Sequence, residues 1–236
     1  ANSVGIDNSF INTGAGNDSV FVNSFASGAP TAAWAIRNSS IDLGSGNDFV
    51  SLNATTFQTQ RRFDPAWGSE NSSIDLGRGD DGLFINANAS GQGEMRAFGA
   101  LNSTINAGAG NDFININANA NSNGGWGWGW GWGGNDPATA NGLASSNVDL
   151  GSGNDFLSIS ASANGGTSNA TAVGNSFINT GAGNDFININ SNAQANGGWG
   201  WGWGANGDAN SVGIDNSFIN TGAGNDFINI NSNAQA

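Results

Sequence analysis

The chain contains no cysteine, no histidine, no lysine and no tyrosine, and each absence excludes a kind of chemistry. Without cysteine there are no disulfides or thiolate metal ligands, and without histidine the usual zinc ligand and general base are missing. We therefore expect that the protein is not an enzyme, because no nucleophile can be paired with a conventional base. Asp64 with Arg61 and Arg62 is the remaining enzymatic alternative, although an ordinary loop explains these residues equally well.

Positive charge is also scarce. Five basic residues stand against 18 acidic ones, which gives a formal net charge of −13. Such a surface disfavours nucleic acid and anionic membranes, because both are bound through Lys and Arg. No apolar run is long enough for a membrane span, and the first ten residues have no signal-peptide pattern. The five basic residues are all arginines in the first half: Arg37, Arg61, Arg62, Arg78 and Arg96.

The sequence does contain an internal repeat, marked by a Gly-x-Gly-Asn-Asp motif or a close variant of it. The spacing of the motifs predicts one repeat domain over residues 1–236, with a unit of roughly thirty residues and two longer units. Gly/Trp-rich insertions at 123–134 and 196–204 account for the longer units. The motifs occupy residues 14–18, 44–48, 77–81, 108–112, 151–155, 181–185 and 222–226.

Around each motif the apolar residues have a period of two. The second and fourth residues after the motif aspartate are always aliphatic, as in Ile114 and Ile116 after Asp112. The seventh residue before it is always Ile or Val, and further apolar segments precede most copies. This pattern predicts an all-β fold, a parallel β-solenoid of seven coils with two or three short strands per coil. Each coil would bury its aliphatic side by stacking on the next coil.

Stacking would place the motif aspartates in a column. Carboxylates one coil apart repel by roughly 4 kcal/mol at an effective dielectric near 20, so the column needs a cation. Hard oxygen ligands in a flexible shell favour Ca²⁺, and we expect several ions between successive loops. The alternative is a plain corner in which each aspartate accepts backbone N–H bonds. The predicted metal ligands are Asp18, Asp48, Asp81, Asp112, Asp155, Asp185 and Asp226. Loop carbonyls would complete the sites near Gly14, Gly16, Gly44, Gly46, Gly77, Gly79, Gly108, Gly110, Gly151, Gly153, Gly181, Gly183, Gly222 and Gly224.

The decapeptide "TGAGNDFINI", present at 180–189 and 221–230, resembles the nonapeptide of repeats-in-toxin (RTX) calcium-binding solenoids, G-G-x-G-x-D-x-U-x. One loop per coil is more similar to the solenoids of ice-binding RTX adhesins. The resemblance implies a secreted, calcium-binding β-solenoid with ions along one edge. Ice binding stays an alternative, although the residue between the two glycines is never threonine.

A column of asparagines ends the apolar segment before most motifs. We interpret these residues as an asparagine ladder between coils. Three of them, Asn38, Asn71 and Asn102, begin Asn-x-Ser/Thr sequons and are candidate glycosylation sites. The column comprises Asn8, Asn38, Asn71, Asn102, Asn175 and Asn216.

The two Trp-Gly tracts would present combs of rings if extended. They could pack on the solenoid, contact a neighbouring molecule or stack against sugar rings, and the sequence does not separate these alternatives. The tryptophans are Trp126, Trp128, Trp130, Trp132, Trp199, Trp201 and Trp203.

Residues 209–226 repeat residues 1–18 identically, and neither copy contains a capping element. We therefore expect an extracellular or cell-surface structural protein that extends along the coil axis, as a longer tandem-repeat chain or as subunits stacked head to tail. A carbohydrate-binding or ice-binding module of a secreted adhesin is the alternative function.

Overall fold

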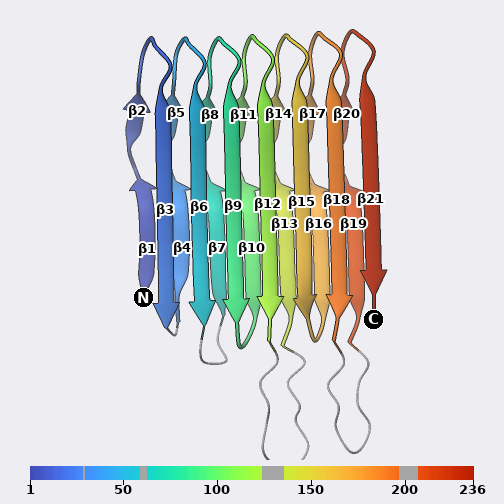
Figure 1. The fold of residues 1–236 in the computed structure, drawn as a ribbon. Helices are drawn as coiled ribbons and strands as arrows, with labels where there is room; N and C mark the ends of the chain where they lie inside the picture. Colours follow the sequence, from blue (N-terminus) through green and yellow to red (C-terminus); the bar gives the residue numbers. More distant parts are fainter. Residues whose placement is uncertain (29, 59–62, 124–135, 197–206) are drawn as a thin grey trace, which may run out of the picture.

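The structure is a computed structural model that describes residues 1–236 except 29, 59–62, 124–135 and 197–206. The described residues contain no helix and form three parallel sheets of seven strands each (Figure 1). Each coil contributes one strand to every sheet, so the predicted parallel β-solenoid of seven coils is confirmed.

We call the sheets first, second and third in the order in which a coil visits them. The first sheet contains β1 (Asn2–Asp7), β4 (Ala32–Arg37), β7 (Asp64–Glu70), β10 (Met95–Leu101), β13 (Ala138–Ala144), β16 (Ser168–Gly174) and β19 (Ala209–Asp215). The second contains β2 (Phe10–Asn12), β5 (Ser40–Asp42), β8 (Ser73–Asp75), β11 (Thr104–Asn106), β14 (Asn147–Asp149), β17 (Phe177–Asn179) and β20 (Phe218–Asn220). The third contains β3 (Ser19–Gly28), β6 (Phe49–Gln58), β9 (Gly82–Gly91), β12 (Phe113–Ser122), β15 (Phe156–Gly165), β18 (Phe186–Ala195) and β21 (Phe227–Gln235).

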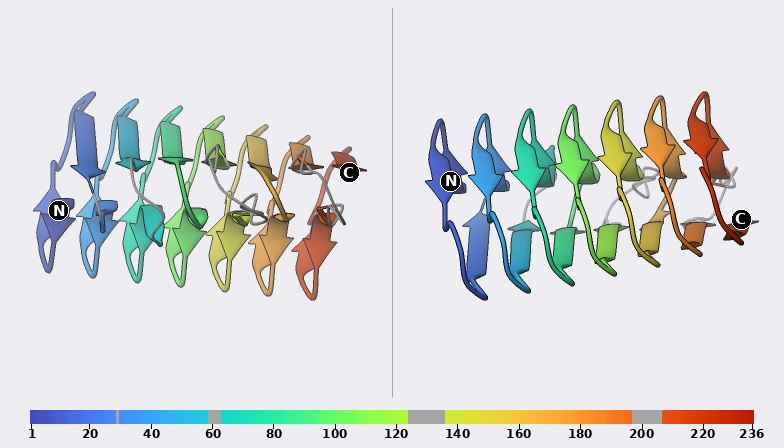
Figure 2. Two further views of the ribbon diagram at one scale, coloured as in Figure 1. Left: turned by 90° about the horizontal axis from the view of Figure 1, so that it is seen from below. Right: turned by 90° about the horizontal axis from the view of Figure 1, so that it is seen from above.

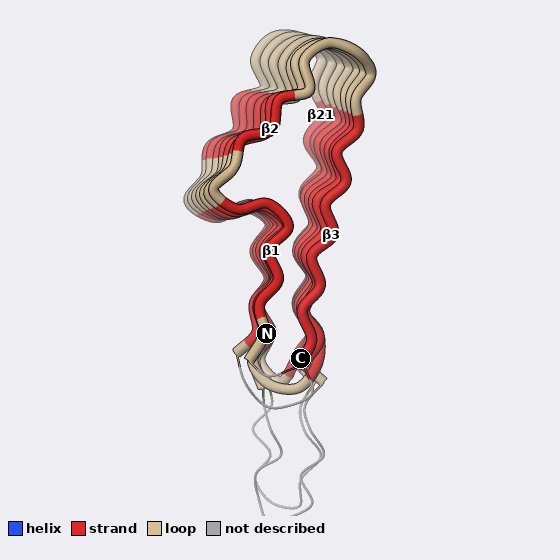
Figure 3. The backbone as a smooth tube through the Cα atoms, turned by 90° about the vertical axis from the view of Figure 1, so that its left-hand side faces the viewer, coloured by secondary structure: helices blue, strands red, loops and turns tan. Residues whose placement is uncertain are grey.

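A single coil is a long, narrow loop when viewed along the stacking axis (Figure 3). In the fourth coil, β10 ends at a corner residue, Asn102, and β11 follows in a new direction. The glycine motif then turns the chain through 108–112 into β12, which runs back beside β10. Successive coils repeat this path side by side (Figure 2).

The register between coils is constant despite their unequal lengths. Ile114 pairs with Leu157 and Ile105 with Val148, although the long insertion lies between these two coils. Both insertions fall in the connections from a third-sheet strand to the next first-sheet strand, where extra residues leave the pairing unchanged.

The core lies between the first and third sheets and beneath the second sheet. In the five inner coils the predicted aliphatic positions are buried, with Ile105, Ile114 and Ile116 all fully covered. Alanines such as Ala118 and Ala120 then continue the inward pattern toward the far end of each third-sheet strand. This continuation makes the third-sheet strands nine or ten residues long, so the prediction of short strands was wrong for this sheet.

Burial of the aliphatic positions depends on a neighbouring coil on both sides. Ile187 and Ile189 in the sixth coil are buried, whereas Ile228 and Ile230 in the seventh are 38% and 49% exposed. These pairs have the same sequence context and differ in whether another coil covers them. The coil therefore forms its core by stacking, as expected of a repeat architecture.

Candidate functional site

The Gly-x-Gly turns bring successive coils into close backbone contact. Gly151 and Gly153 have φ angles of +88° and +140°, which L-residues with side chains rarely adopt. A Cβ atom added to Gly153 would lie 1.6 Å from the carbonyl oxygen of Gly110 in the preceding coil. Glycine is thus required here by both conformation and space.

Backbone hydrogen bonds join these turns from coil to coil. The amide of Ser152 donates to the carbonyl of Gly108 at 3.0 Å, and the amide of Gly110 donates to the carbonyl of Ser152 at 2.8 Å. The same pair of bonds recurs between all seven turns. Among the loop carbonyls predicted as metal ligands, that of the first glycine therefore already accepts one backbone hydrogen bond. It retains a second lone pair for another donor or a cation.

The seven motif aspartates form one column, as the sequence predicts. In six of them one carboxylate oxygen, Oδ1, accepts the backbone N–H of the aspartate in the preceding coil. The N–O distances range from 2.7 Å, for Asp18 with Asp48, to 3.1 Å, for Asp185 with Asp226. The plain-corner alternative, in which an aspartate accepts a backbone N–H, thus explains the position of Oδ1 but not that of Oδ2. The accepting residues are Asp48, Asp81, Asp112, Asp155, Asp185 and Asp226.

The residue before each aspartate forms a second ladder in the opposite direction. Its side-chain oxygen accepts the backbone N–H of the corresponding residue in the following coil, as Asn111 does from Asn154 at 2.9 Å. Asp80 takes the place of asparagine in the third coil and accepts from Asn111 at 2.7 Å. Sequence reasoning missed this ladder, although the Asn-Asp pair in the motif was its signal.

The other carboxylate oxygen of the column, Oδ2, has no hydrogen-bond partner and is shielded from solvent. In the five inner coils these aspartate residues are only 2–3% exposed. A buried carboxylate without a partner is costly, so an oxygen of this kind points to a missing cation or proton. The unpartnered Oδ2 atoms belong to Asp18, Asp48, Asp81, Asp112, Asp155 and Asp185.

Burial and repulsion from neighbouring carboxylates raise the proton affinity of three aspartates in the middle of the column. Burial, together with the charges of neighbouring aspartates, raises the pKa of Asp155 to about 7 and that of Asp81 to about 6. The pKa of Asp112 is raised mainly by burial as well. The ion pairs that the structure shows lie elsewhere, between Arg37 and Asp7 and between Arg96 and Glu94.

The column offers a cation a series of single carboxylate oxygens and not a preformed cage. Within the described residues, no three carboxylates gather as a metal cluster. Two Oδ2 atoms of adjacent coils, with the second lone pairs of loop carbonyls, are the oxygens that could hold Ca²⁺ between coils. The residues present are thus of the kind that calcium prefers, and water would complete its shell.

The asparagine column lies at the corner between the first and second sheets. Its members have φ angles of +43° to +50°, and Ser145 adopts the same conformation in the fifth coil. Asparagine tolerates this left-handed conformation better than most residues, which explains the column directly. Two of the predicted side-chain ladder bonds form, from Asn71 to Asn38 and from Asn216 to Asn175.

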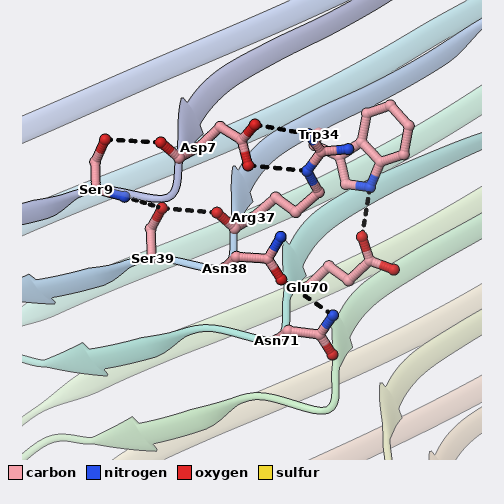
Figure 4. A network of polar contacts seen from close by, with 8 residues as sticks. All are labelled: Asp7, Ser9, Trp34, Arg37, Asn38, Ser39, Glu70 and Asn71. Atoms are coloured by element: carbon pink, nitrogen blue, oxygen red, sulfur yellow. Dashed lines mark hydrogen bonds and ion pairs between the residues drawn. The ribbon is translucent and has the colours of Figure 1, made fainter.

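A buried serine ladder follows the asparagine corner (Figure 4). The Ser39 hydroxyl accepts the N–H of Ser9 at 3.0 Å and donates to the carbonyl of Arg37 at 2.7 Å. Nearby, Arg37 forms its ion pair with Asp7 and lies over the ring of Trp34. Sequence reasoning missed this ladder, whose signal was a serine after every corner residue. Its accepting serines are Ser39, Ser72, Ser103, Ser146, Ser176 and Ser217.

The candidate glycosylation sites Asn38, Asn71 and Asn102 are exposed at this corner. They lie on adjacent coils, about 4.8 Å apart, which is too close for three bulky glycans side by side. The seven tryptophans of the Trp-Gly tracts lie outside the described residues.

A stacked column of phenylalanines, also missed, runs along the outer face of the third sheet. Phenylalanine directly follows the motif aspartate in five of the seven coils. In the first and third coils the ring comes from two residues further on, from Phe21 and Phe84. The rings form one unbroken series with centroids 4.9–5.5 Å apart: Phe21, Phe49, Phe84, Phe113, Phe156, Phe186 and Phe227.

Comparisons with known proteins gave no match, whether to protein-family models, to curated proteins or to solved structures. In the described part of the chain, no helix is long and apolar enough to cross a membrane.

Proposed function

We propose that this chain is a structural segment of an extracellular fibre, a stiff β-solenoid rod that extends by stacking further coils. The observation that carries the proposal is that every junction between the described coils repeats the same backbone, aspartate and serine ladders. Residues 1–18 and 209–226 have the same sequence, so the first and seventh coils carry the same ladder groups. A coil stacked on either side, from the same chain or from another copy, would continue every ladder.

Calcium is the second part of the proposal. Ions held between the Oδ2 atoms of successive coils would neutralise a column that otherwise opposes stacking. The acidic composition, the lack of cationic partners in the second half and the motif resemblance all support this assignment. A non-enzymatic role fits a site whose units repeat identically, because catalysis requires a unique constellation.

The test combines metal binding with electron microscopy. Calorimetric titration should show several bound Ca²⁺ per chain, and the melting temperature should fall in EGTA. Micrographs in calcium should show thin unbranched filaments that shorten in EGTA. A protein that stays monomeric at high concentration in calcium would refute end-to-end stacking of separate copies, and an unchanged melting temperature in EGTA would refute the role of calcium.

A further inference from the structure

The outer face of the third sheet differs from the rest of this acidic molecule. Its seven strands contain no Asp, Glu, Lys or Arg, although the chain has 18 acidic residues. The first and second sheets carry acidic residues such as Asp7, Asp42, Asp75, Asp149 and Asp215 on their strands. A second copy would meet like charges on those sheets but none on the strands of the third.

The phenylalanine column occupies one edge of this uncharged face. Phe113 and Phe186 are each 37% exposed, and Phe21 is 67% exposed. Beside the column lie rows of asparagine, in which Asn53, Asn86 and Asn117 are joined by side-chain hydrogen bonds of 2.8–3.0 Å. Each amide in such a row keeps unused hydrogen-bonding capacity for a group that approaches from outside.

The geometry of the rings disfavours a sugar as the occupant. Phe113, Phe156 and Phe186 have centroids 4.9 and 5.3 Å apart and planes within 4° of parallel. Parallel rings at this distance must overlap face to face, because coplanar rings would collide at their edges. The faces of these rings are therefore covered where they meet, whereas a sugar ring needs an open face. The exposed edges suit close packing against another apolar surface.

The size of the face suits a protein partner. Strands of ten residues and a stack of seven coils give a face of roughly 33 by 30 Å, on the order of 1,000 Å². Two such faces in contact would bury about 2,000 Å² in total, which is the area of a stable protein–protein interface.

We propose that the outer face of the third sheet binds the same face of a second copy of this chain, which pairs two rods laterally. The coil spacing of the two copies is identical, so their rows can stay in phase along the whole contact. A two-fold axis along the strand direction places the two phenylalanine columns opposite each other, with the rods antiparallel. This pairing is sideways and thus independent of the end-to-end stacking under Proposed function.

The experiment compares charge substitutions on two faces. Phe113→Lys with Phe186→Lys places charges on the proposed interface, and Phe177→Lys with Phe218→Lys is the matched control on the second sheet, where these rings also stack. Sedimentation velocity over a concentration series should show pairing of the unmodified chain and the control, and a shift of the interface variant to single rods. Equal pairing by the interface variant would overturn the proposal.

Two further measurements keep the test decisive. If the phenylalanine variant does not fold by circular dichroism, Asn119→Lys with Asn192→Lys adds charge to the same face without removing a stacked ring. Small-angle scattering separates the two kinds of assembly, because lateral pairing enlarges the rod cross-section and end-to-end stacking only its length. Growth in length with no change of cross-section would overturn lateral pairing and leave the fibre intact. Retention on insoluble cellulose or chitin without any pairing would assign the face to carbohydrate and also overturn the proposal.

Discussion

Replacing Asp155 by asparagine should have opposite effects with and without calcium. The amide keeps an oxygen that can accept the N–H of Asp112, so the coil–coil hydrogen bond survives. It removes one charge from a carboxylate that is 2% exposed and faces aspartates in both adjacent coils. Burial and these neighbouring charges raise the pKa of Asp155 from 3.8 to about 7. The shift corresponds to about 4 kcal/mol by which the fold disfavours the ionised form.

In EGTA at pH 8 we therefore expect Asp155→Asn to raise the free energy of unfolding, by up to about 4 kcal/mol. In saturating calcium the same variant should be less stable than the unmodified chain, because it weakens the ions on both sides of the fifth coil. Urea unfolding followed by circular dichroism in the two buffers measures both values. The control is Asp215→Asn, which makes the same change of charge at an exposed carboxylate. It should have little effect on the free energy of unfolding in either buffer. Equal destabilisation by Asp155→Asn in both buffers would show that the column needs no neutralisation.

Three further outcomes follow from the ladders and turns. Because the pKa of Asp155 is raised to about 7, the folded chain holds protons that the unfolded chain has lost, so without metal its melting temperature should fall as the pH rises from about 4 to about 7. A melting temperature that rises over this range in EGTA would contradict that argument. Gly151→Ala should destabilise the fold by several kcal/mol, because the new Cβ would lie 1.9 Å from a carbonyl oxygen of the preceding coil. Gly14→Ala has a similar φ but open space around it, so it should cost only about 1–2 kcal/mol. Thermal unfolding of the two variants isolates the cost of close stacking, and equal losses of stability would disprove that cost. Ser103→Ala leaves the buried N–H of Ser72 without an acceptor and should lower the free energy of unfolding in urea by about 1–3 kcal/mol. The control Ser73→Ala, at an exposed serine, should leave this free energy nearly unchanged. Similar losses for both variants would mean that the serine ladder contributes nothing to stability.

The repeat length and the alternation made the solenoid predictable. Ile105, Ile114 and Ile116 alternate on either side of a glycine turn, and each has a counterpart in every coil, so both the inward face and the register followed from the sequence. The aspartate column followed for the same reason. A one-residue slip would have turned these side chains outward, which is why this part of the prediction is strongly determined.

The ladders were harder to predict, because they depend on which atom of a side chain faces the next coil. The sequence left open whether Asp155 binds a cation or accepts a backbone N–H, and in the structure one of its oxygens accepts the N–H of Asp112. The asparagine corner depends on a left-handed backbone that Ser145 also adopts, so residue type alone does not determine it. The phenylalanine column is continuous because Phe21 and Phe84 replace a missing ring from a different position, and a fixed motif position cannot show this.

The opposed ladders make the two faces of every coil chemically different. One face presents the aspartate and serine oxygens that accept N–H groups from the coil before it, and the other presents the asparagine oxygens that accept from the coil after it. Two coils brought together by matching faces would oppose donor to donor and acceptor to acceptor. A growing rod would therefore be directional, with ends that recruit new coils at different rates. An antiparallel pair of such rods would cancel this polarity and grow alike in both directions.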